Sequence, residues 1–308
     1  MAIQHELSWS ASRAGTFATC KRRYYYDYYL SWLGWGASAE PARRKAYLLK
    51  KMTRMPMLAG DLVHQAIEGW LRGRAHGRSQ NLEQLVGFVT QGLRDGYKSS
   101  RDGAWKSRPS KLVHLAEHHY QEPVVAEADG SAGAYGKRYL ERMESALRTF
   151  MESDALLAVR EADPAAFLAC EEMSTFELFS TKIYAIPDFA YRAPDGRVHV
   201  YDWKTGRPNE RDAFQLAVYV EYAVAKWDAD PDEVVCYDAY LGDGNLVQVH
   251  STEETRAEVL ERIRVSMEAM AEVHFNADRE AGDPQAFPAI EPGPVCASCN
   301  YRELCDRC

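Results

Sequence analysis

The sequence predicts an α/β fold in which one central mixed β-sheet is flanked by helices, with a helical N-terminal region and a C-terminal cysteine cluster. Three observations lead to this class. Apolar residues recur with helical spacing over much of the first 165 residues. Short runs rich in aromatic and β-branched residues then alternate with helical patterns, and four cysteines fall in the last thirteen residues. A succession of helix, strands, helix and strands is typical of helices packed on one sheet.

The composition is that of an ordinary globular protein. The chain has 308 residues, of which 46% are apolar and 27% charged, and this length is enough to bury a substantial core. No apolar run approaches the roughly 18 to 20 residues that cross a bilayer. The start, MAIQHELSWS, lacks a basic and then apolar signal pattern. We therefore expect a cytoplasmic protein that has no membrane partner.

Charge is distributed unevenly along the chain. The formal net charge of −8 argues against a general nucleic-acid coat, because phosphate binding uses surplus Lys and Arg. Residues 1–60 nevertheless contain ten Lys or Arg and three acids, a balance of +7, which leaves −15 on the remainder. A polyanion would be attracted to that end of the chain, although a solvated helical face would have the same composition.

Residues 1–60 are expected to be helical and to carry Cys20. Ser8, Ser10 and Ser12 offer N-caps ahead of an aromatic-rich helix that runs from about residue 13 to 30. The helical phases of its tyrosines differ, so some face the core while others reach the surface, either as packing or as a base-stacking surface. The candidate nucleic-acid contacts in this region are Lys21, Arg22, Arg23 and Tyr24.

Residues 61–165 are expected to form a second helical region. The segment GDLVHQAIEGWL lies within a helical stretch from about 57 to 95, and it places Leu62, Ile67, Trp70 and Leu71 near one apolar stripe. Between about residues 97 and 136 the sequence is polar and broken by Gly and Pro, which favours a flexible insertion. A further helix is expected from residue 139 to about 160.

Residues 166–252 are predicted to hold most of the sheet. Apolar and aromatic runs indicate strands around 176–178, 183–189 and 198–201, followed by a helix from 212 to about 227. A strand pair is expected at 234–240 and 246–250. In residues 253–308 a helix from 253 to about 274 and a Pro/Gly-rich connector precede the cysteines. We expect these parts to form one integrated domain.

The most informative segment is IYAIPDFAYRAPDGRVHVYDWKTGRP. Its Ala193-Pro194-Asp195-Gly196 is typical of a type I turn followed by a bulged return strand. A hairpin with a three-residue loop centred on Asp195 pairs positions whose numbers sum to 390. Asp188 then lies opposite Asp202.

Lys204 joins these two carboxylates, because strand residues two apart share a face. Facing carboxylates repel unless a cation lies between them, and two carboxylates with a backbone carbonyl suit Mg²⁺ or Mn²⁺. Such a metal polarises a phosphodiester, while Lys204 orients the attacking water or neutralises charge on the phosphate. Solvated hairpin charges would give the same pattern.

Pro187-Asp188 followed by Asp202-x-Lys204 resembles the signature of the PD-(D/E)xK nuclease superfamily, which implies a restriction-endonuclease-like core. Further matches resemble its RecB-like branch with an iron-sulfur cluster, which includes the nuclease domain of AddB and the exonucleases of CRISPR adaptation. Gly60-x-x-x-His64 matches a helix of that branch. The resemblance makes His64 a metal ligand beside Asp188 and Asp202, whereas a His on such a helix is by itself more often a packed or surface residue.

Gln215-x-x-x-Tyr219 matches a motif on the helix that follows the Asp-x-Lys strand. Its spacing puts both side chains on one helical face. The resemblance implies that they join the catalytic residues Asp188, Asp202 and Lys204 by contacting the DNA strand or the metal-bound water. The alternative is a solvated Gln215 and a core Tyr219.

The cysteines provide another match. Phe17-x-x-Cys20, together with the C-terminal Cys296-x-x-Cys299-x5-Cys305, resembles the four ligands of a [4Fe-4S] cluster in that branch. Such a cluster would tie the first helix to the C-terminal tail. Cys308 leaves a second possibility open, in which the four terminal cysteines bind Zn²⁺ without Cys20. The two remaining cysteines, Cys170 and Cys236, are expected to be buried thiols.

Together these features predict a Mg²⁺- or Mn²⁺-dependent deoxyribonuclease. The resemblance implies a single-strand exonuclease that acts in recombination, repair or CRISPR-type DNA processing, with a protein partner from one of those processes. No helicase motif accompanies the signature, so any motor would be another polypeptide. Two alternatives stay open: a DNA-binding adaptor that keeps the cluster but does not cut, and a zinc-stabilised protein unrelated to nucleases.

Overall fold

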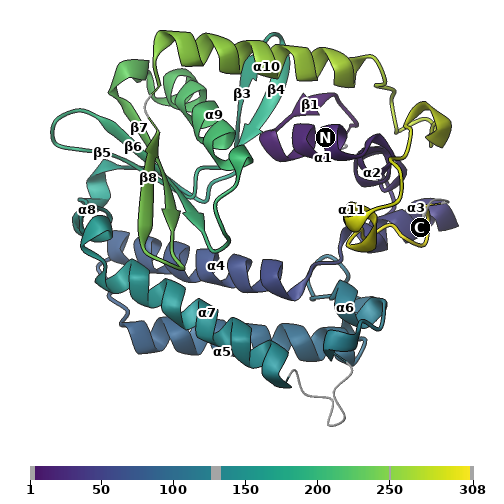
Figure 1. Cartoon of the computed structure of the whole chain (residues 1–308), viewed down its shortest axis with the longest axis horizontal. Helices are drawn as coiled ribbons and strands as arrows, with labels where there is room; N and C mark the ends of the chain where they lie inside the picture. Colours follow the sequence, from purple (N-terminus) through teal and green to yellow (C-terminus); the bar gives the residue numbers. More distant parts are fainter. Residues whose placement is uncertain (1–3, 126–132, 250, 306–308) are drawn as a thin grey trace.

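Two mixed β-sheets form the centre of the molecule (Figure 1). The computed structural model describes residues 4–125, 133–249 and 251–305. The larger sheet has five strands in the order β2 (Phe167–Cys170), β5 (Phe189–Arg192), β6 (Val198–Lys204), β7 (Val234–Tyr240) and β8 (Asn245–Val249). The smaller sheet has the order β1 (Ser8–Trp9), β4 (Thr181–Ala185) and β3 (Ser174–Leu178). The α/β class with a mixed sheet and flanking helices is thus confirmed.

The expectation of one sheet is corrected to two. The smaller sheet depends on β1, which pairs in parallel with β4 through Ser8 and Lys182 and through Trp9 and Ile183. These partners are far apart in the chain, so no local pattern reveals that they pair. Trp9 is fully buried, and its indole N–H donates to Ser266 Oγ at 2.7 Å. Strand β1 is thereby held against β4 on one side and against the helix that carries Ser266 on the other.

The predicted hairpin register is confirmed. In β5 and β6, Phe189 pairs with Tyr201 and Arg192 with Val198, and both pairs sum to 390. Gly196 has a φ of +92°, the left-handed conformation that the bulged turn requires. On its other side β6 pairs in parallel with β7, and this register sets Asp202 beside Asp238.

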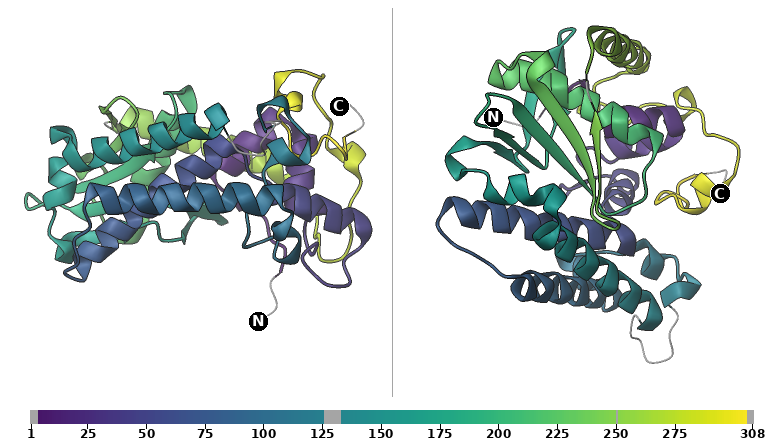
Figure 2. Two further views of the ribbon diagram at one scale, coloured as in Figure 1. Left: turned by 90° about the horizontal axis from the view of Figure 1, so that it is seen from below. Right: turned by 60° about the vertical axis from the view of Figure 1, so that its left-hand side comes forward.

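The five-stranded sheet separates two apolar cores. Along β6, Val198 and Val200 pack into one core, while Tyr201 and Trp203 pack into the other, as the alternation of strand side chains requires. Helix α9 (Glu210–Trp227) packs in the first core, which α10 (Glu253–Ala271) also borders. The second core is covered by three long helices, α4 (Met55–Ala75), α5 (Leu82–Arg101) and α7 (Gly133–Glu152), which form a layer beneath the sheet (Figures 1 and 2).

Several helices differ from the predicted boundaries. The helical stretch expected over 57–95 is two helices, α4 and α5, because a turn intervenes and the capping box of Asn81 and Gln84 starts the second. The insertion expected over 97–136 is partly helical in its described residues. It holds the end of α5 and the short helices η2 (Ala104–Ser107), α6 (Ala116–His119) and η3 (Pro123–Val125). The helix expected over 139–160 is α7, η4 (Asp154–Leu156) and α8 (Leu157–Glu161).

The single N-terminal helix expected over 13–30 is broken at Cys20. Ser10 caps α1 (Ala11–Thr19), and Cys20 then adopts an extended conformation, with φ −161° and ψ 111°. Cys20 also caps the next helix, because its Sγ accepts a hydrogen bond from the backbone N–H of Arg23 at 3.5 Å. The chain continues as α2 (Lys21–Tyr25), the π-helical η1 (Tyr26–Leu30) and α3 (Pro41–Lys50).

The C-terminal segment returns to this N-terminal region (Figures 1 and 2). Most of the crowded tyrosines are core residues there: Tyr24, Tyr25, Tyr26 and Tyr29 are all buried. The hydroxyl of Tyr26 donates to the carbonyl of Leu304 at 2.8 Å. The remaining short helices are η5 (Pro164–Ala166), η6 (Pro231–Glu233), η7 (Pro284–Ala286) and α11 (Pro294–Ala297). No helix among the described residues is both long and apolar enough to cross a membrane.

A buried histidine beside α6 makes the fold sensitive to acid. The His114 ring stacks on Trp105 at 3.5 Å and is nearly inaccessible. Burial, together with His119 and His118, lowers the His114 pKa to about 4. As the pH falls from about 6.5 towards 4, the unfolded chain takes up a proton that the folded chain excludes, so stability is lost in that window.

We expect His114→Phe, which keeps a ring on Trp105, to reduce this loss. Between pH 7 and pH 5 the free energy of unfolding should fall by about 2 kcal/mol less in the variant than in the wild type, following the shift of the His114 pKa. Urea denaturation at the two pH values measures the difference. An equal fall in both proteins would contradict the prediction.

Candidate functional site

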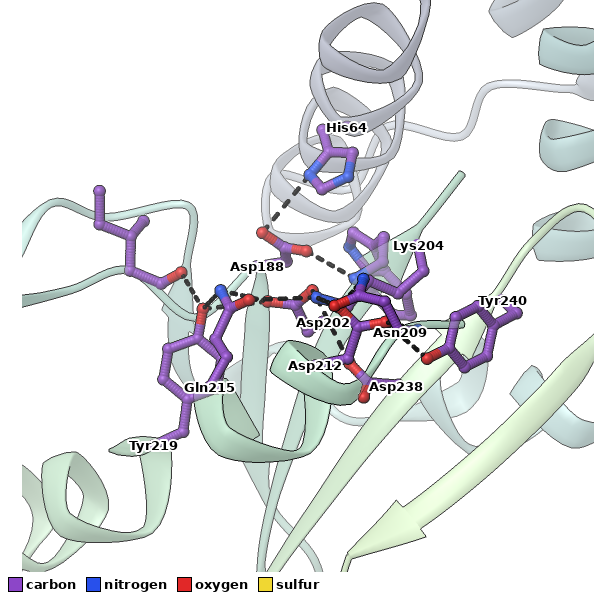
Figure 3. A network of polar contacts seen from close by, with 12 residues as sticks. His64, Asp188, Asp202, Lys204, Asn209, Asp212, Gln215, Tyr219, Asp238 and Tyr240 are labelled. Carbon is purple, nitrogen blue, oxygen red and sulfur yellow. Dashed lines mark hydrogen bonds and ion pairs between the residues drawn. The ribbon is translucent and has the colours of Figure 1, made fainter. Parts of the chain in front are cut away.

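The acidic end of the β5–β6 hairpin forms the floor of the site (Figure 3). Asp188 directly precedes β5 and is 6% exposed. Its Oδ2 accepts a hydrogen bond from the backbone N–H of Trp203 at 2.6 Å. This bond crosses the hairpin at the position where the register brings Asp188 beside Asp202. The sequence prediction that the two carboxylates face each other is therefore confirmed.

Asp202 and Lys204 lie on the same face of β6, as predicted. Lys204 Nζ is 2.6 Å from Asp202 Oδ2. The other oxygen, Asp202 Oδ1, accepts hydrogen bonds from Gln215 Nε2 and the Tyr219 hydroxyl, each at 3.0 Å. Both oxygens of Asp202 are thus engaged by other side chains.

Gln215 and Tyr219 come from one face of α9, because Gln215 Nε2 lies 2.8 Å from the Tyr219 hydroxyl. Gln215 also contacts the lysine, since its Oε1 accepts a hydrogen bond from Lys204 Nζ at 3.1 Å. Tyr219 is a core residue, yet its hydroxyl reaches the acidic hairpin. Helix α9 therefore fixes the orientation of both Asp202 and Lys204.

A second group of potential ligands lies beside this network. His64 of α4, Glu171 after β2 and Asp188 place ligand atoms within 4.8 Å of one another. His64 Nδ1 is 3.1 Å from Glu171 Oε1 and 3.4 Å from Asp188 Oδ1. Asp202, expected as the third metal ligand, lies outside this group. A cation shared between Asp188 and Asp202 would have to displace Lys204 from Asp202.

Sequence reasoning missed Glu171. It lies immediately after β2 in a left-handed conformation, with φ +52°, and its backbone N–H donates to the carbonyl of Asp188 at 3.1 Å. The available signal was the pair Glu171-Glu172 at the end of a strand, but only the pairing of β2 with β5 brings that end to Asp188.

The electrostatics show a concentration of buried negative charge. Burial and the neighbouring Asp202 raise the Asp188 pKa to about 7. Burial lowers the pKa of His64, but the carboxylates of Asp188 and Glu171 outweigh it and raise that pKa to about 11. Positive charge is thus favoured at this position. Two carboxylates and one imidazole are donors that Mn²⁺ accepts, and carboxylates also suit Mg²⁺. The residues present fit a divalent cation.

Two further acids, also missed from the sequence, surround Lys204. Its Nζ lies 3.5 Å from Asp238 Oδ1 and 3.7 Å from Asp212 Oδ1. Asp238 is 2% exposed, and burial raises its pKa to about 6, although Lys204 opposes the shift. The hydroxyl of Tyr240 donates to Asp212 Oδ2 at 2.8 Å and holds that carboxylate in place. These acids would retain Lys204 if a cation took Asp202 from it.

The cysteines form a separate candidate site. Cys20, Cys296, Cys299 and Cys305 line one pocket and are free thiols. Cys299 Sγ accepts a hydrogen bond from the backbone N–H of Tyr301 at 3.4 Å. The fifth candidate, Cys308, lies outside the described residues. Cys170 and Cys236 are buried elsewhere, as predicted, and burial raises the pKa of the Cys170 thiol to about 12.

The expected nucleic-acid contacts of Arg22 and Tyr24 need correction. Tyr24 is 1% exposed and packs edge-on against Phe17, so its ring is not free to stack on a base. Arg22 is 6% exposed, and its Nε donates to the carbonyl of Phe287 at 2.8 Å. Both are held by tertiary packing around the return of the C-terminal segment. Lys21 and Arg23 are partly exposed.

A groove connects the two candidate sites. One wall is the α1 face, with small side chains that include Ser12, Gly15 and Thr19, and the opposite wall carries Asp212, Gln215 and Tyr219. Arg23 and Val295, which also line the cysteine pocket, lie along the same groove. A chain-like ligand in the groove would therefore contact the acidic network and the edge of the cysteine region.

A sequence model described as the PD-(D/E)XK nuclease superfamily matches residues 8–306. The chain belongs to this superfamily. Membership indicates a nuclease that uses a divalent metal, and it implies a nucleic-acid substrate. No curated protein matches the chain. Among solved structures, "Crystal structure of SSO0001" is similar at 13% identity and a TM-score of 0.29, covering 69% of this chain and 84% of that one. This weak likeness adds nothing on function.

The geometry predicts that Glu171 contributes to metal binding. Glu171→Gln removes one anionic oxygen from the group and should weaken Mn²⁺ binding roughly tenfold or more. Glu172→Gln is the matched control, because the neighbouring side chain is 63% exposed and lies outside the group. Isothermal titration with Mn²⁺ measures both variants. Equal Mn²⁺ affinity in the two would remove Glu171 from the site.

Proposed function

We propose that this member of the superfamily is a Mg²⁺- or Mn²⁺-dependent deoxyribonuclease that degrades single-stranded DNA from an end. One observation carries the proposal: Asp188, Asp202 and Lys204 converge on one hairpin and are held there by Gln215 and Tyr219 of α9 (Figure 3). Of the reactions open to such a group, phosphodiester hydrolysis uses both the acidic ligands and the lysine.

The metal would be held by His64, Glu171 and Asp188, with Asp202 joining when Lys204 moves aside. When bound, the metal would act as a Lewis acid on the scissile phosphate. Lys204, retained by Asp238, is placed to neutralise charge that develops on the phosphate. Gln215 bonds both Lys204 and Asp202, and so couples the position of the cation-binding acid to that of the lysine.

The groove beside α1 supports a single strand as substrate. Its α1 wall has small side chains, which allow a sugar-phosphate backbone to approach closely, and the Ser12 hydroxyl can donate to a phosphate. Arg262, on the opposite wall, lies over the Phe214 ring at 4.1 Å. This pair combines a positive charge with an aromatic ring, as single-strand grooves commonly do.

We also propose that Cys20, Cys296, Cys299 and Cys305 bind a [4Fe-4S] cluster, as in the RecB-like branch. Four free thiols on one pocket supply the ligand set. The backbone N–H groups of Arg23 and Tyr301 donate to the sulfur atoms of Cys20 and Cys299, which suits them to stabilise negative sulfur. The cluster's role is to tie α1 and α2 to the C-terminal segment. The same branch suggests work in recombination, repair or CRISPR-type processing, with any motor supplied by a partner protein.

The nuclease proposal predicts that Lys204→Ala abolishes cleavage while DNA binding persists. Loss of a positive charge beside the phosphate should lower the rate at least roughly 100-fold. The assay follows cleavage of end-labelled single-stranded and duplex DNA in the presence of Mg²⁺, Mn²⁺ or chelator. The amount of cleavage gives the activity, and the label that is released shows which end is degraded. Lys226→Ala, which removes an exposed lysine from the end of α9, is the matched control and should cut normally.

Undiminished cleavage by Lys204→Ala would contradict the catalytic assignment. Tight DNA binding by wild-type protein without cleavage, with either Mg²⁺ or Mn²⁺, would instead favour a DNA-binding adaptor.

The cluster proposal predicts iron and acid-labile sulfide in protein purified without oxygen. Cys20→Ser should lose most of both, because it removes one of four ligands. Cys236→Ser is the matched control, since this buried thiol lies in the sheet and lines no part of the cysteine pocket. Zinc in place of iron would overturn the cluster, and zinc that survives Cys20→Ser would assign the metal to the terminal cysteines.

A further inference from the structure

An exposed tryptophan stands on the surface between η1 and α3. Trp35 is 43% exposed and lies between two glycines in the loop over residues 31–39. Its ring meets Trp32 edge-on, with centroids 5.1 Å apart, and lies 6.2 Å from the ring of Tyr47 on α3. The exposed part of this ring is available to stack against a ligand.

The loop is held rigidly in this position. Gly34 packs so closely on α3 that a Cβ would lie 2.3 Å from the carbonyl oxygen of Arg43. Arg43 donates to the carbonyl of Trp32 at 2.7 Å, and Trp32 Nε1 donates to Asp278 Oδ1 at 2.6 Å. Trp35 therefore stands on an ordered base, and little conformational entropy would be lost when a ligand stacks on it.

Positive charge lies over the neighbouring Tyr47 ring. Arg44 lies 6.0 Å and Lys51 Nζ 5.6 Å from the centroid of the Tyr47 ring. Neither cation forms an ion pair with any residue that the structure describes. One acid, Glu40, lies near these cations in the sequence. It directly precedes α3 and is four residues before Arg44. The surface formed by Trp35, Arg44, Tyr47 and Lys51 is part of the region whose sequence carries a balance of +7.

We propose that the surface formed by Trp35, Arg44, Tyr47 and Lys51 binds single-stranded nucleic acid at a distance from the acidic site. The inference rests on the proposed function, because it extends the path of the substrate. Exposed aromatic rings stack on unpaired bases, and nearby cations neutralise phosphates. A duplex hides its base faces, and an uncharged protein surface would leave Arg44 and Lys51 without an anionic partner. The occupant is therefore a strand with free bases.

The position of α3 fits a contact with the distal part of a long strand. Figure 1 shows α3 beside α11 and the C-terminal segment, on the side of the molecule away from β6 and β7. An ion pair of 2.7 Å between Lys45 and Glu303 links the helix to this segment. A short strand bound in the groove beside α1 would not extend as far as the surface formed by Trp35, Arg44, Tyr47 and Lys51. A longer strand would contact it.

The test compares the binding of two fluorescent oligothymidylates, an octamer and a 30-mer, by anisotropy in chelator. Without divalent ions no strand is cut, so the result does not depend on cleavage. Trp35→Ala should weaken binding of the 30-mer roughly tenfold, the size of one lost base stack. Lys51→Ala should weaken it by a smaller factor and reduce its salt dependence. Octamer binding should change less than twofold in either variant.

Matched controls separate this effect from a loss of folding. Trp35→Phe keeps a stacking face and should retain most of the affinity for the 30-mer. Phe179→Ala and Lys182→Ala remove an exposed ring and a surface charge from the β3–β4 hairpin, and should bind both strands like the wild type.

Wild-type affinity for the 30-mer in Trp35→Ala and Lys51→Ala would overturn the proposal and leave the surface to a protein. Equal weakening for both strand lengths would also overturn it. Failure to cut DNA, with length-dependent binding intact, would count against the proposed function alone.

Discussion

Buried carboxylates that lie this close together cannot all stay ionised unless positive charge offsets them, and this constraint shapes the site. Asp188, Asp202 and Asp238 are each nearly inaccessible, and removing such groups from water is costly. In the structure the compensation comes from His64 on one side and Lys204 on the other. A bound divalent cation would also offset this negative charge.

The surrounding fold is arranged to hold that charge cluster. The hairpin fixes the register of the acids, α4 brings the histidine, and α9 brings the amide and the hydroxyl that orient Asp202. Gly60, one turn before His64, allows α4 to approach the chain after β6, since a Cβ there would lie 2.9 Å from Thr205 Oγ1. The Gly-x-x-x-His pattern thus has a packing reason as well as a chemical one.

Closure of the chain on itself is the second organising feature. The N-terminal helices and the described C-terminal segment lie side by side (Figure 1). One pocket between them is lined by Cys20, Cys296, Cys299 and Cys305. Arg22 and Tyr24 show the consequence, because residues that look like a basic, aromatic binding face are used to hold this junction. An exposed ring and two cations of the same region lie instead in the loop of Trp35 and along α3.

The sequence by itself determined the elements with local causes. Turn chemistry at Pro194 and Gly196 set the hairpin register, alternation set the shared face of Asp202 and Lys204, and helical spacing set that of Gln215 and Tyr219. Only the tertiary structure decided which distant segments meet: Glu171 beside His64, Asp238 beside Lys204, β1 beside β4, and Tyr24 in the core. Register and periodicity act between near neighbours, whereas these contacts depend on how sheets and helices pack, which no local pattern specifies.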